Sequence, residues 1–193
     1  APELSQMVAL GLAPKVAAGF LKEMTREVIE DTENHTRGVD RLRVIVDSSG
    51  EVGAFSASNA RNVSIYKRED KRVLHVGGII VAPELQGKRV GTSLVRSEMR
   101  IEGANLLAFH TQNRYMLDLG EKVTQYSYML SAVLATEFET LNPIEQIVGG
   151  VRRVIQENRY GQGSLYGHLR RDIAIKGLGK GGNAIFYVGE RNK

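Results

Sequence analysis

The chain has 193 residues, of which 42% are hydrophobic and 25% charged, with a formal net charge of +4 and no cysteine. This length and composition predict one globular domain over residues 1–193, long enough to bury a core without covalent cross-links. The lack of cysteine excludes disulfides, thiolate nucleophiles and cysteine-based metal sites, and four scattered histidines predict no metal site at all.

The N-terminal segment predicts a helix followed by two hairpins. Apolar residues recur every four positions, at Val16, Phe20, Met24 and Val28. This stripe is typical of an amphipathic helix, expected from Pro14 to about Asp31, with a short helix before it. Residues 42–47 and 52–57 then predict a hairpin around a Ser-Ser-Gly turn. Residues 63–67 and 73–81 predict a second hairpin with a charged turn.

The middle of the chain alternates strands and helices. Paired glycines, Gly77 and Gly78, lie inside a predicted strand and indicate a bulge or a close approach of a ligand. The pattern then predicts a helix over 91–102, a buried parallel strand over 106–110 and a helix over 113–123.

The C-terminal third predicts more helix and a final hairpin. Residues 126–141 favour helix, and Asn-Pro-Ile-Glu at 142–145 is a helix start signal followed by an apolar stripe of helical period. We therefore expect a helical insertion at about 126–171. Residues 172–176 and 184–190 predict two strands around a glycine-rich loop. The order of elements indicates an α+β domain on a mixed sheet.

No apolar run approaches the roughly 20 residues that span a bilayer, and the N-terminus lacks a basic stretch before its apolar part. We therefore expect a cytoplasmic protein with no membrane contact. The positive net charge favours an anionic ligand but does not choose between nucleic acid, a membrane surface and a phosphorylated cofactor. A mildly basic soluble protein accounts for that charge equally well.

One loop between a predicted strand and a predicted helix stands out. It reads Gln-Gly-Lys-Arg-Val-Gly-Thr over residues 86–92. The first turn of a helix has backbone N–H groups without intrahelical partners and carries the positive end of the helix dipole. Small residues, here Gly87 and Gly91, let an anion reach these groups, while Lys88 and Arg89 add positive charge. The loop is therefore a candidate phosphate-binding site.

This loop resembles the pyrophosphate-binding motif of the GCN5-related N-acetyltransferase (GNAT) superfamily, usually written Q/R-x-x-G-x-G/A. Gln86 and Gly91 match its first and last positions, whereas Arg89 stands where the family most often has glycine. Neighbouring elements follow the order found in the family, so the resemblance covers about residues 42–123 and is strongest over 75–94. It implies a mixed, mostly antiparallel sheet with a central splayed parallel strand pair and flanking helices.

The resemblance also implies that acetyl-CoA is the acyl donor and that a primary amine attacks it directly in a ternary complex. Backbone amides of the loop would bind the pyrophosphate, from Gln86 through Gly87, Lys88, Arg89, Val90 and Gly91 to Thr92. Ile79 falls where a strand N–H polarises the thioester carbonyl, and Val81 where main chain bonds the pantetheine arm. Asn113 resembles the residue near the end of that arm.

An amine is mostly protonated at neutral pH, so a base assists its attack. His75 falls where one branch of the family has a glutamate base, and an imidazole pKa near 6.5 suits the task. His110, at the end of the next strand, is the competing candidate. The family commonly uses a tyrosine as general acid, but Gly120 occupies that position, which leaves Tyr115, Tyr126 and Tyr128 as substitutes.

Other interpretations stay open. A non-catalytic acyl-CoA-binding or assembly protein would keep the fold and lack the acid tyrosine. We do not expect nucleic-acid binding, because few aromatic residues accompany the basic residues at 67–72 and 170–171. The Gly177-x-Gly179-x-x-Gly182 spacing fits a dinucleotide fingerprint, but a strand follows it, which favours a hairpin loop. The long segment 126–171 would shape the acceptor pocket or form a homodimer surface. The acceptor itself is not predicted.

Overall fold

A computed structural model describes residues 4–19, 23–65, 69–138, 140, 142–157, 159, 174–176, 178 and 182–191. Its strands are β1 Arg41–Val46, β2 Val52–Ile65, β3 Glu69–Val81, β4 Leu106–Thr111, β5 Thr124–Tyr126, β6 Pro143–Val148, β7 Val151–Gln156 and β8 Ala184–Arg191. Its helices are α1 Leu4–Gly19, α2 Arg26–Thr36, α3 Val90–Ile101, α4 Arg114–Val123 and α5 Tyr128–Leu134, with short 3-10 helices η1 Pro83–Leu85 and η2 Thr136–Phe138. No helix in the described ranges is long and apolar enough to cross a bilayer.

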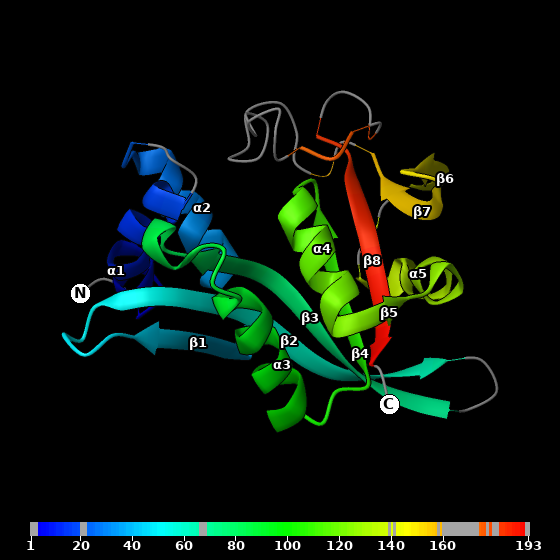
Figure 1. The fold of residues 1–193 in the computed structure, drawn as a ribbon, viewed down its shortest axis with the longest axis horizontal. Coiled ribbons are helices and arrows are strands. Elements are labelled where there is room, and N and C mark those ends of the chain that lie inside the picture. The colour runs from blue at the N-terminus through cyan, green and yellow to red at the C-terminus, as the bar shows by residue number, and fades with distance from the viewer. Residues whose placement is uncertain are drawn as a thin grey trace.

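The strands form one mixed sheet in the order β1-β2-β3-β4-β8-β7-β6, and β5 also pairs with β8. Within the described sheet only β3 and β4 run parallel, and they pair over just three residues, from Val73–His75 to Leu106–Ala108. Beyond this short ladder the two strands diverge (Figure 1). The predicted fold class, with its splayed parallel pair in a mostly antiparallel sheet, is therefore confirmed.

Helices cover both faces of the sheet. The front face carries α3 and α4, which pack on alternate residues of the central strands such as Leu74 and Phe109 (Figure 1). The back face carries α5 and η2, whose Phe138 packs against the intervening residues such as Val73. On the same back face α1 and α2 cover Phe55 of β2. The alternation of apolar side chains along each strand thus produces one core on the front face and two on the back face.

The predicted single helix over 14–31 is wrong, because the segment forms two helices. Pro14 lies inside α1, and α2 begins only after Thr25, whose side-chain oxygen accepts a hydrogen bond from Val28 N at 3.3 Å. An N-cap threonine of this kind starts a new helix, although the apolar stripe continues across the break.

The two predicted hairpins share a strand. Their inner arms merge into the continuous β2, so β1, β2 and β3 form a meander. Opposite Ala57 and Ser58 the register of β3 shifts by one residue, which leaves Gly77 as the extra residue of a bulge. The bulge predicted at Gly77 and Gly78 is therefore confirmed.

The helix predicted from residue 142 is wrong, because these residues form the hairpin of β6 and β7. Gly149 and Gly150 have φ of +59° and +79° and connect the two strands, as two-residue hairpin turns require. Pro143 starts the edge strand, where its missing N–H breaks no ladder. The insertion expected at 126–171 is therefore helical only in part, over α5 and η2, and residues 160–171 lie outside the described ranges.

At the C-terminus the predicted strand β8 is confirmed. Its expected partner at 172–176 is not formed as a strand in the described residues, where Ala174 makes an isolated bridge to Asn113. Gly177 and Gly179 of the glycine-rich loop lie outside the described part of the chain.

Candidate functional site

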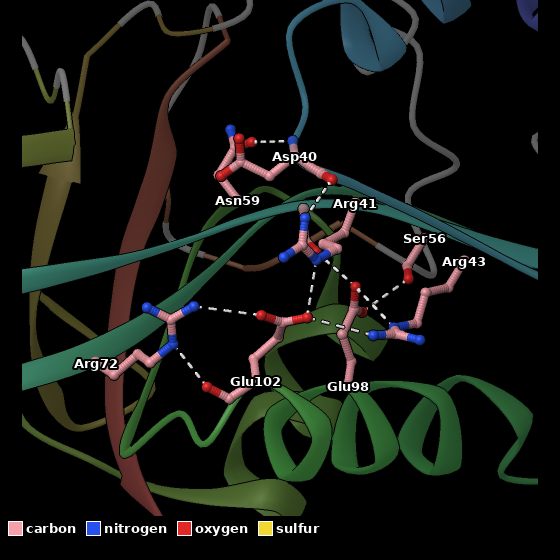
Figure 2. Close-up of polar contacts among 9 residues, drawn as sticks. Asp40, Arg41, Arg43, Ser56, Asn59, Arg72, Glu98 and Glu102 are labelled. Atoms are coloured by element: carbon pink, nitrogen blue, oxygen red, sulfur yellow. Dashed lines mark hydrogen bonds and ion pairs between the residues drawn. The ribbon is translucent and has the colours of Figure 1, made fainter.

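Buried polar contacts fix helix α3 on the sheet (Figure 2). The carboxylate of Glu98 is fully buried and accepts hydrogen bonds from Ser56 Oγ at 2.8 Å and Ser58 Oγ at 2.5 Å, both on β2. One turn on, Glu102 forms ion pairs with three arginines of the meander, namely Arg41, Arg43 and Arg72. Because these donors offset the desolvation of the carboxylates, α3 is held at two points and its N-terminus has a defined place.

The loop before α3 presents backbone donors. Gly87 has φ of +77°, and Arg89, the N-cap, has φ of +62° with an exposed side chain. The amides of Gln86 and Lys88 already donate, to Pro83 O at 3.2 Å and Leu85 O at 3.3 Å. These two amides therefore already have backbone acceptors. No backbone acceptor is found within the described chain for the other amides of the loop, those of Gly87, Arg89, Val90, Gly91 and Thr92. Pyrophosphate binding by the loop amides from Gln86 to Thr92 stays a prediction.

This loop packs directly on the strand that precedes it. A methyl group added at Gly91 would lie 3.3 Å from Leu119 Cδ1 and 3.5 Å from both Ile79 Cδ1 and Val81 Cγ2. The side chain of Gln86 also reaches back, donating from Nε2 to Val81 O at 3.0 Å. The structure thus brings the loop together with the two strand residues predicted to bind the thioester arm.

The outer half of β3 has one open edge. Ala82 N donates to Gly53 O of β2 at 2.8 Å, and backbone groups alternate in direction along a strand. The N–H groups of Ile79 and Val81 therefore point away from β2, towards β4. Since pairing with β4 ends at His75, these two donors face the gap between the diverging strands.

The two histidines predicted as bases lie together where the pairing of β3 and β4 ends, at His75 and Ala108, which we call the vertex of the gap. On the back face, the ring centroids of His75 and His110 are 6.1 Å apart, and Phe138 lies 4.9 Å from His75. Burial, with a smaller contribution from Arg61 and Arg159, lowers the pKa of His75 to about 4. Burial likewise lowers the pKa of His110 to about 2. Both rings are therefore neutral near pH 7 and are weak bases for an ammonium group.

Their hydrogen-bonding environments differ. Nε2 of His110 lies 3.0 Å from Thr140 Oγ1, whereas Nε2 of His75 is buried with no hydrogen-bond partner among the described residues. Burying such an atom is unfavourable unless something bonds to it. His75 therefore has a buried ring nitrogen at the vertex of the gap whose hydrogen-bonding capacity is not satisfied by the described residues.

Two further predicted residues lie at the start of α4. Asn113 caps this helix, with Oδ1 accepting from Tyr115 N at 2.8 Å, so its carbonyl oxygen is already engaged. The side chain of Tyr115 is 64% exposed. Because α4 packs on the front face and both histidines lie on the back face, the structure does not bring Tyr115 together with them.

The other tyrosines have structural partners. At Gly120, an added methyl group would lie 2.7 Å from Phe109 Cζ and 3.0 Å from Tyr187 Cζ, so no side chain fits there without rearrangement. The Tyr187 hydroxyl bonds to Thr124 Oγ1 at 3.0 Å, and burial raises its pKa to about 12. The remaining two hydroxyls contact the β6–β7 hairpin, Tyr126 donating to Arg152 O and Tyr128 to Glu145.

Sequence reasoning missed a small cavity of about 20 Å³ on the back face beneath α2. Asp31 and His35 of α2 line it, together with Phe55, Gly78 and Ile80 of the sheet. Gly78 directly follows the bulged residue, so this cavity adjoins the strand segment that carries Ile79. The available signal was the i, i+4 spacing of an acid and a histidine on a predicted helix, which places both on one side.

The loop, the splayed strands and the bulge occur in the arrangement that the sequence motif implied. The sheet order, the short parallel pair and the bulge agree with the fold that the resemblance to the GNAT superfamily implied. No protein-family model and no curated protein sequence matches it. Solved structures that it is similar to include a protein provisionally assigned as a phosphinothricin N-acetyltransferase, at 17% identity and TM-score 0.48, covering 100% of this chain and 96% of that one.

Two other solved structures are similarly distant. One is an aminoglycoside 6'-acetyltransferase type Ii, at 14% identity and TM-score 0.46, covering 98% of this chain and 94% of that one. The other is Naa20 of Chaetomium thermophilum in complex with a bisubstrate analogue, at 12% identity and TM-score 0.43, covering 92% and 81%. Such values describe a likeness of fold, and the function has to be argued from the site.

Proposed function

We propose that this protein is an N-acyltransferase that transfers the acetyl group of acetyl-CoA to a primary amine. One observation carries the proposal: the donor-rich loop before α3 packs on β3 where that strand has an open edge. Loop amides and Lys88 suit a diphosphate, and the N–H groups of Ile79 and Val81 suit an extended amide-containing arm and a thioester carbonyl. Few ligands other than an acyl-CoA combine these features.

In this proposal, the position of each residue determines its role in the reaction. The N–H of Ile79 donates to the thioester oxygen, where negative charge develops as the amine attacks. With no cysteine in the chain to carry the acyl group, the amine nitrogen attacks the carbonyl carbon directly, and the C–S bond then breaks. The acceptor approaches from the back face, because α3 and α4 cover the front.

A non-catalytic acyl-CoA-binding protein is the second candidate. The close packing around Gly120 favours it, since this glycine leaves no room for an acid tyrosine. Turnover separates the two functions, because a binding protein takes up acetyl-CoA and releases no thiol with any amine. The predicted homodimer and cytoplasmic location stay predictions under either function.

Titration calorimetry with acetyl-CoA tests the shared binding step. We expect the wild-type chain to bind and the Gly91→Val variant to bind at least about tenfold more weakly, because its side chain would enter the contact with Ile79, Val81 and Leu119. Gly11→Ala is the matched control, since a methyl group there meets no atom within 4 Å. Equal affinity of wild type and Gly91→Val would contradict the proposal.

A further inference from the structure

An arginine of β2 lies beside the vertex on the back face. The guanidinium carbon of Arg61 is 4.1 Å from the ring centroid of Phe138, and this ring packs against His75. Nη2 of Arg61 also donates a hydrogen bond to the carbonyl oxygen of Glu137. Stacking and this hydrogen bond hold the guanidinium in place. After burial, which is the main cause, the charge of Arg61 contributes most to the lowered pKa of His75.

A second arginine, Arg159, lies at the end of the sheet towards which the gap opens. Strands β4 and β7 both run antiparallel to β8, and Thr111 and Ile155 both pair with Ile185. The C-terminal ends of β4 and β7 are therefore at the same end of the sheet, beyond the short β3–β4 ladder. Arg159 follows the end of β7, and its side chain is partly buried.

The charge of Arg159 acts on both sides of the gap. The main influences on the histidine pKa values are burial at the vertex and the Asp31 hydrogen bond on α2. Beyond these, Arg159 lowers the pKa of three histidines of the back face, namely His35, His75 and His110. The guanidinium is therefore within electrostatic reach of α2 and of the vertex at once.

Neither arginine forms an ion pair with a carboxylate among the described residues. In that part of the chain, the charged groups that act on the pKa of His75 are these two cations. Asp31, which lines the cavity beneath α2, already contacts His35. The back face at the vertex therefore has a positive potential, which repels an amine that carries positive charge alone. An anionic group on the acceptor would offset the cost of a partly buried guanidinium without a partner.

We propose that the acceptor is a small amine that also carries an oxyanion, as a free amino acid does, and that Arg159 and Arg61 bind this oxyanion. This inference rests on the proposed N-acyltransferase function and names its substrate class. A guanidinium binds a carboxylate or a phosphate through two parallel hydrogen bonds, which orients the rest of the molecule. The ammonium group loses one proton to solvent, and the neutral nitrogen forms the C–N bond as the C–S bond breaks. The leaving thiolate takes the second proton.

The test measures thiol release from acetyl-CoA with matched pairs of acceptors that differ in the anion. The pairs are the common L-amino acids against their carboxamides, and O-phosphoethanolamine against ethanolamine. Spermidine and kanamycin represent amines with positive charge alone. We expect turnover of at least one anionic acceptor, with kcat/KM at least about tenfold above that of its partner without the anion. The two kinds of pair distinguish a carboxylate from a phosphate.

Arg159→Gln tests the role of the arginine. We expect the ratio of kcat/KM between the anionic acceptor and its partner to fall to about one-tenth of the wild-type ratio or lower. The change is mainly in KM for the anionic acceptor, and the Kd for acetyl-CoA measured by calorimetry is unchanged. A loss of stability would affect both acceptors equally and leave the ratio as it is. Arg159→Lys keeps the charge without the planar guanidinium and gives an intermediate ratio.

Two further variants complete the comparison. Arg61→Gln lowers the same ratio by less than Arg159→Gln, because the side chain of Arg61 is more exposed to solvent. Arg26→Gln is the matched control, since it also removes one positive charge. The side chain of Arg26 is 91% exposed and pairs with Glu30 of the same helix. Its ratio stays that of wild type.

The possible outcomes separate the two proposals. Faster wild-type turnover of carboxamides, spermidine or kanamycin than of any anionic acceptor overturns this inference and leaves the N-acyltransferase function standing. A preference for an anionic acceptor that is the same in wild type, Arg159→Gln and Arg61→Gln overturns the role of the arginines. Binding of acetyl-CoA without turnover on any acceptor overturns this inference and favours the binding protein. Absence of acetyl-CoA binding by the wild-type chain overturns the proposed function and this inference together.

Discussion

The back face of the sheet holds histidines in two contrasting environments. His75 and His110 lie together at the vertex of the splayed strands, where the ring of Phe138 packs against His75 and Thr140 Oγ1 lies 3.0 Å from Nε2 of His110. His35 lies on α2, where it lines the small cavity beneath that helix and contacts Asp31. Burial lowers the pKa of the first two, whereas the hydrogen bond to Asp31 raises that of the third.

The contrast indicates that a carboxylate partner can outweigh burial in setting the pKa of an imidazole. A half-buried ring with a paired acid stays basic, and a desolvated ring without one stays neutral. His75 and His110, the two histidines predicted as bases, are therefore neutral at pH 7. The pKa of His35, which was not predicted as a base, is raised by its hydrogen bond to Asp31.

Acid destabilisation is the largest expected consequence of this contrast. An unfolded chain protonates His75 and His110 near pH 6.5, but the folded chain does so only near pH 4 and pH 2. The free energy of unfolding therefore falls as the pH drops below 6.5, by about 2–3 kcal/mol for each histidine between pH 7 and 4.5. Urea titrations at several pH values measure this loss for the wild type and for a double variant that carries both His75→Leu and His110→Gln.

In the double variant we expect the loss over that pH interval to shrink by about 5 kcal/mol, the sum of the two contributions. Carboxylates that titrate in the same interval contribute equally to both proteins and cancel in the difference. Identical pH dependence of the two proteins would show that the vertex histidines are protonated in the folded state.

A carboxylate introduced at the vertex should convert one environment into the other. Thr140 Oγ1 lies 3.0 Å from Nε2 of His110, so Thr140→Asp places an acid beside that ring. We expect the pKa of His110 to rise by about one to three units relative to Thr140→Asn, which has a similar shape and no charge. NMR titration of the ring protons measures the shift. A pKa that is the same in both variants would contradict the carboxylate explanation.

Much of the fold could be predicted from local sequence patterns, and the wrong predictions also have local causes. Helix α3 was predictable from its periodic apolar stripe, β4 from its short apolar run, and the loop from its glycine motif. The β6–β7 hairpin was mistaken for a helix because residues 144–155 place apolar side chains at spacings that fit either structure. The two consecutive glycines decide for the turn, since both adopt positive φ.

Only the part of the candidate site that consists of backbone groups could be located from the sequence. A loop motif specifies N–H donors through chain geometry, so Gly91 and its neighbours could be placed from the sequence. The pKa of an imidazole depends on burial and on partners distant in sequence, such as Phe138 and Thr140 for the vertex pair. Asp31 and His35 are local to each other, but their place beside Gly78 depends on how α2 docks on the sheet.

The pH dependence of stability at α2 has the opposite sign and is the smallest expected effect. Because the folded pKa of His35 is raised, its pairing with Asp31 stabilises the fold fully below pH 6.5 and less as the pH rises through that folded pKa. The side chains of His35 and Asp31 are 32% and 28% exposed, so solvent screens the pair. Wild type should lose stability between pH 6 and 8 relative to His35→Gln in urea titrations, while Glu30→Gln follows wild type. A difference of the reverse sign would place His35 with the vertex pair, as a ring that prefers to be neutral, and would remove the physical distinction between the two environments.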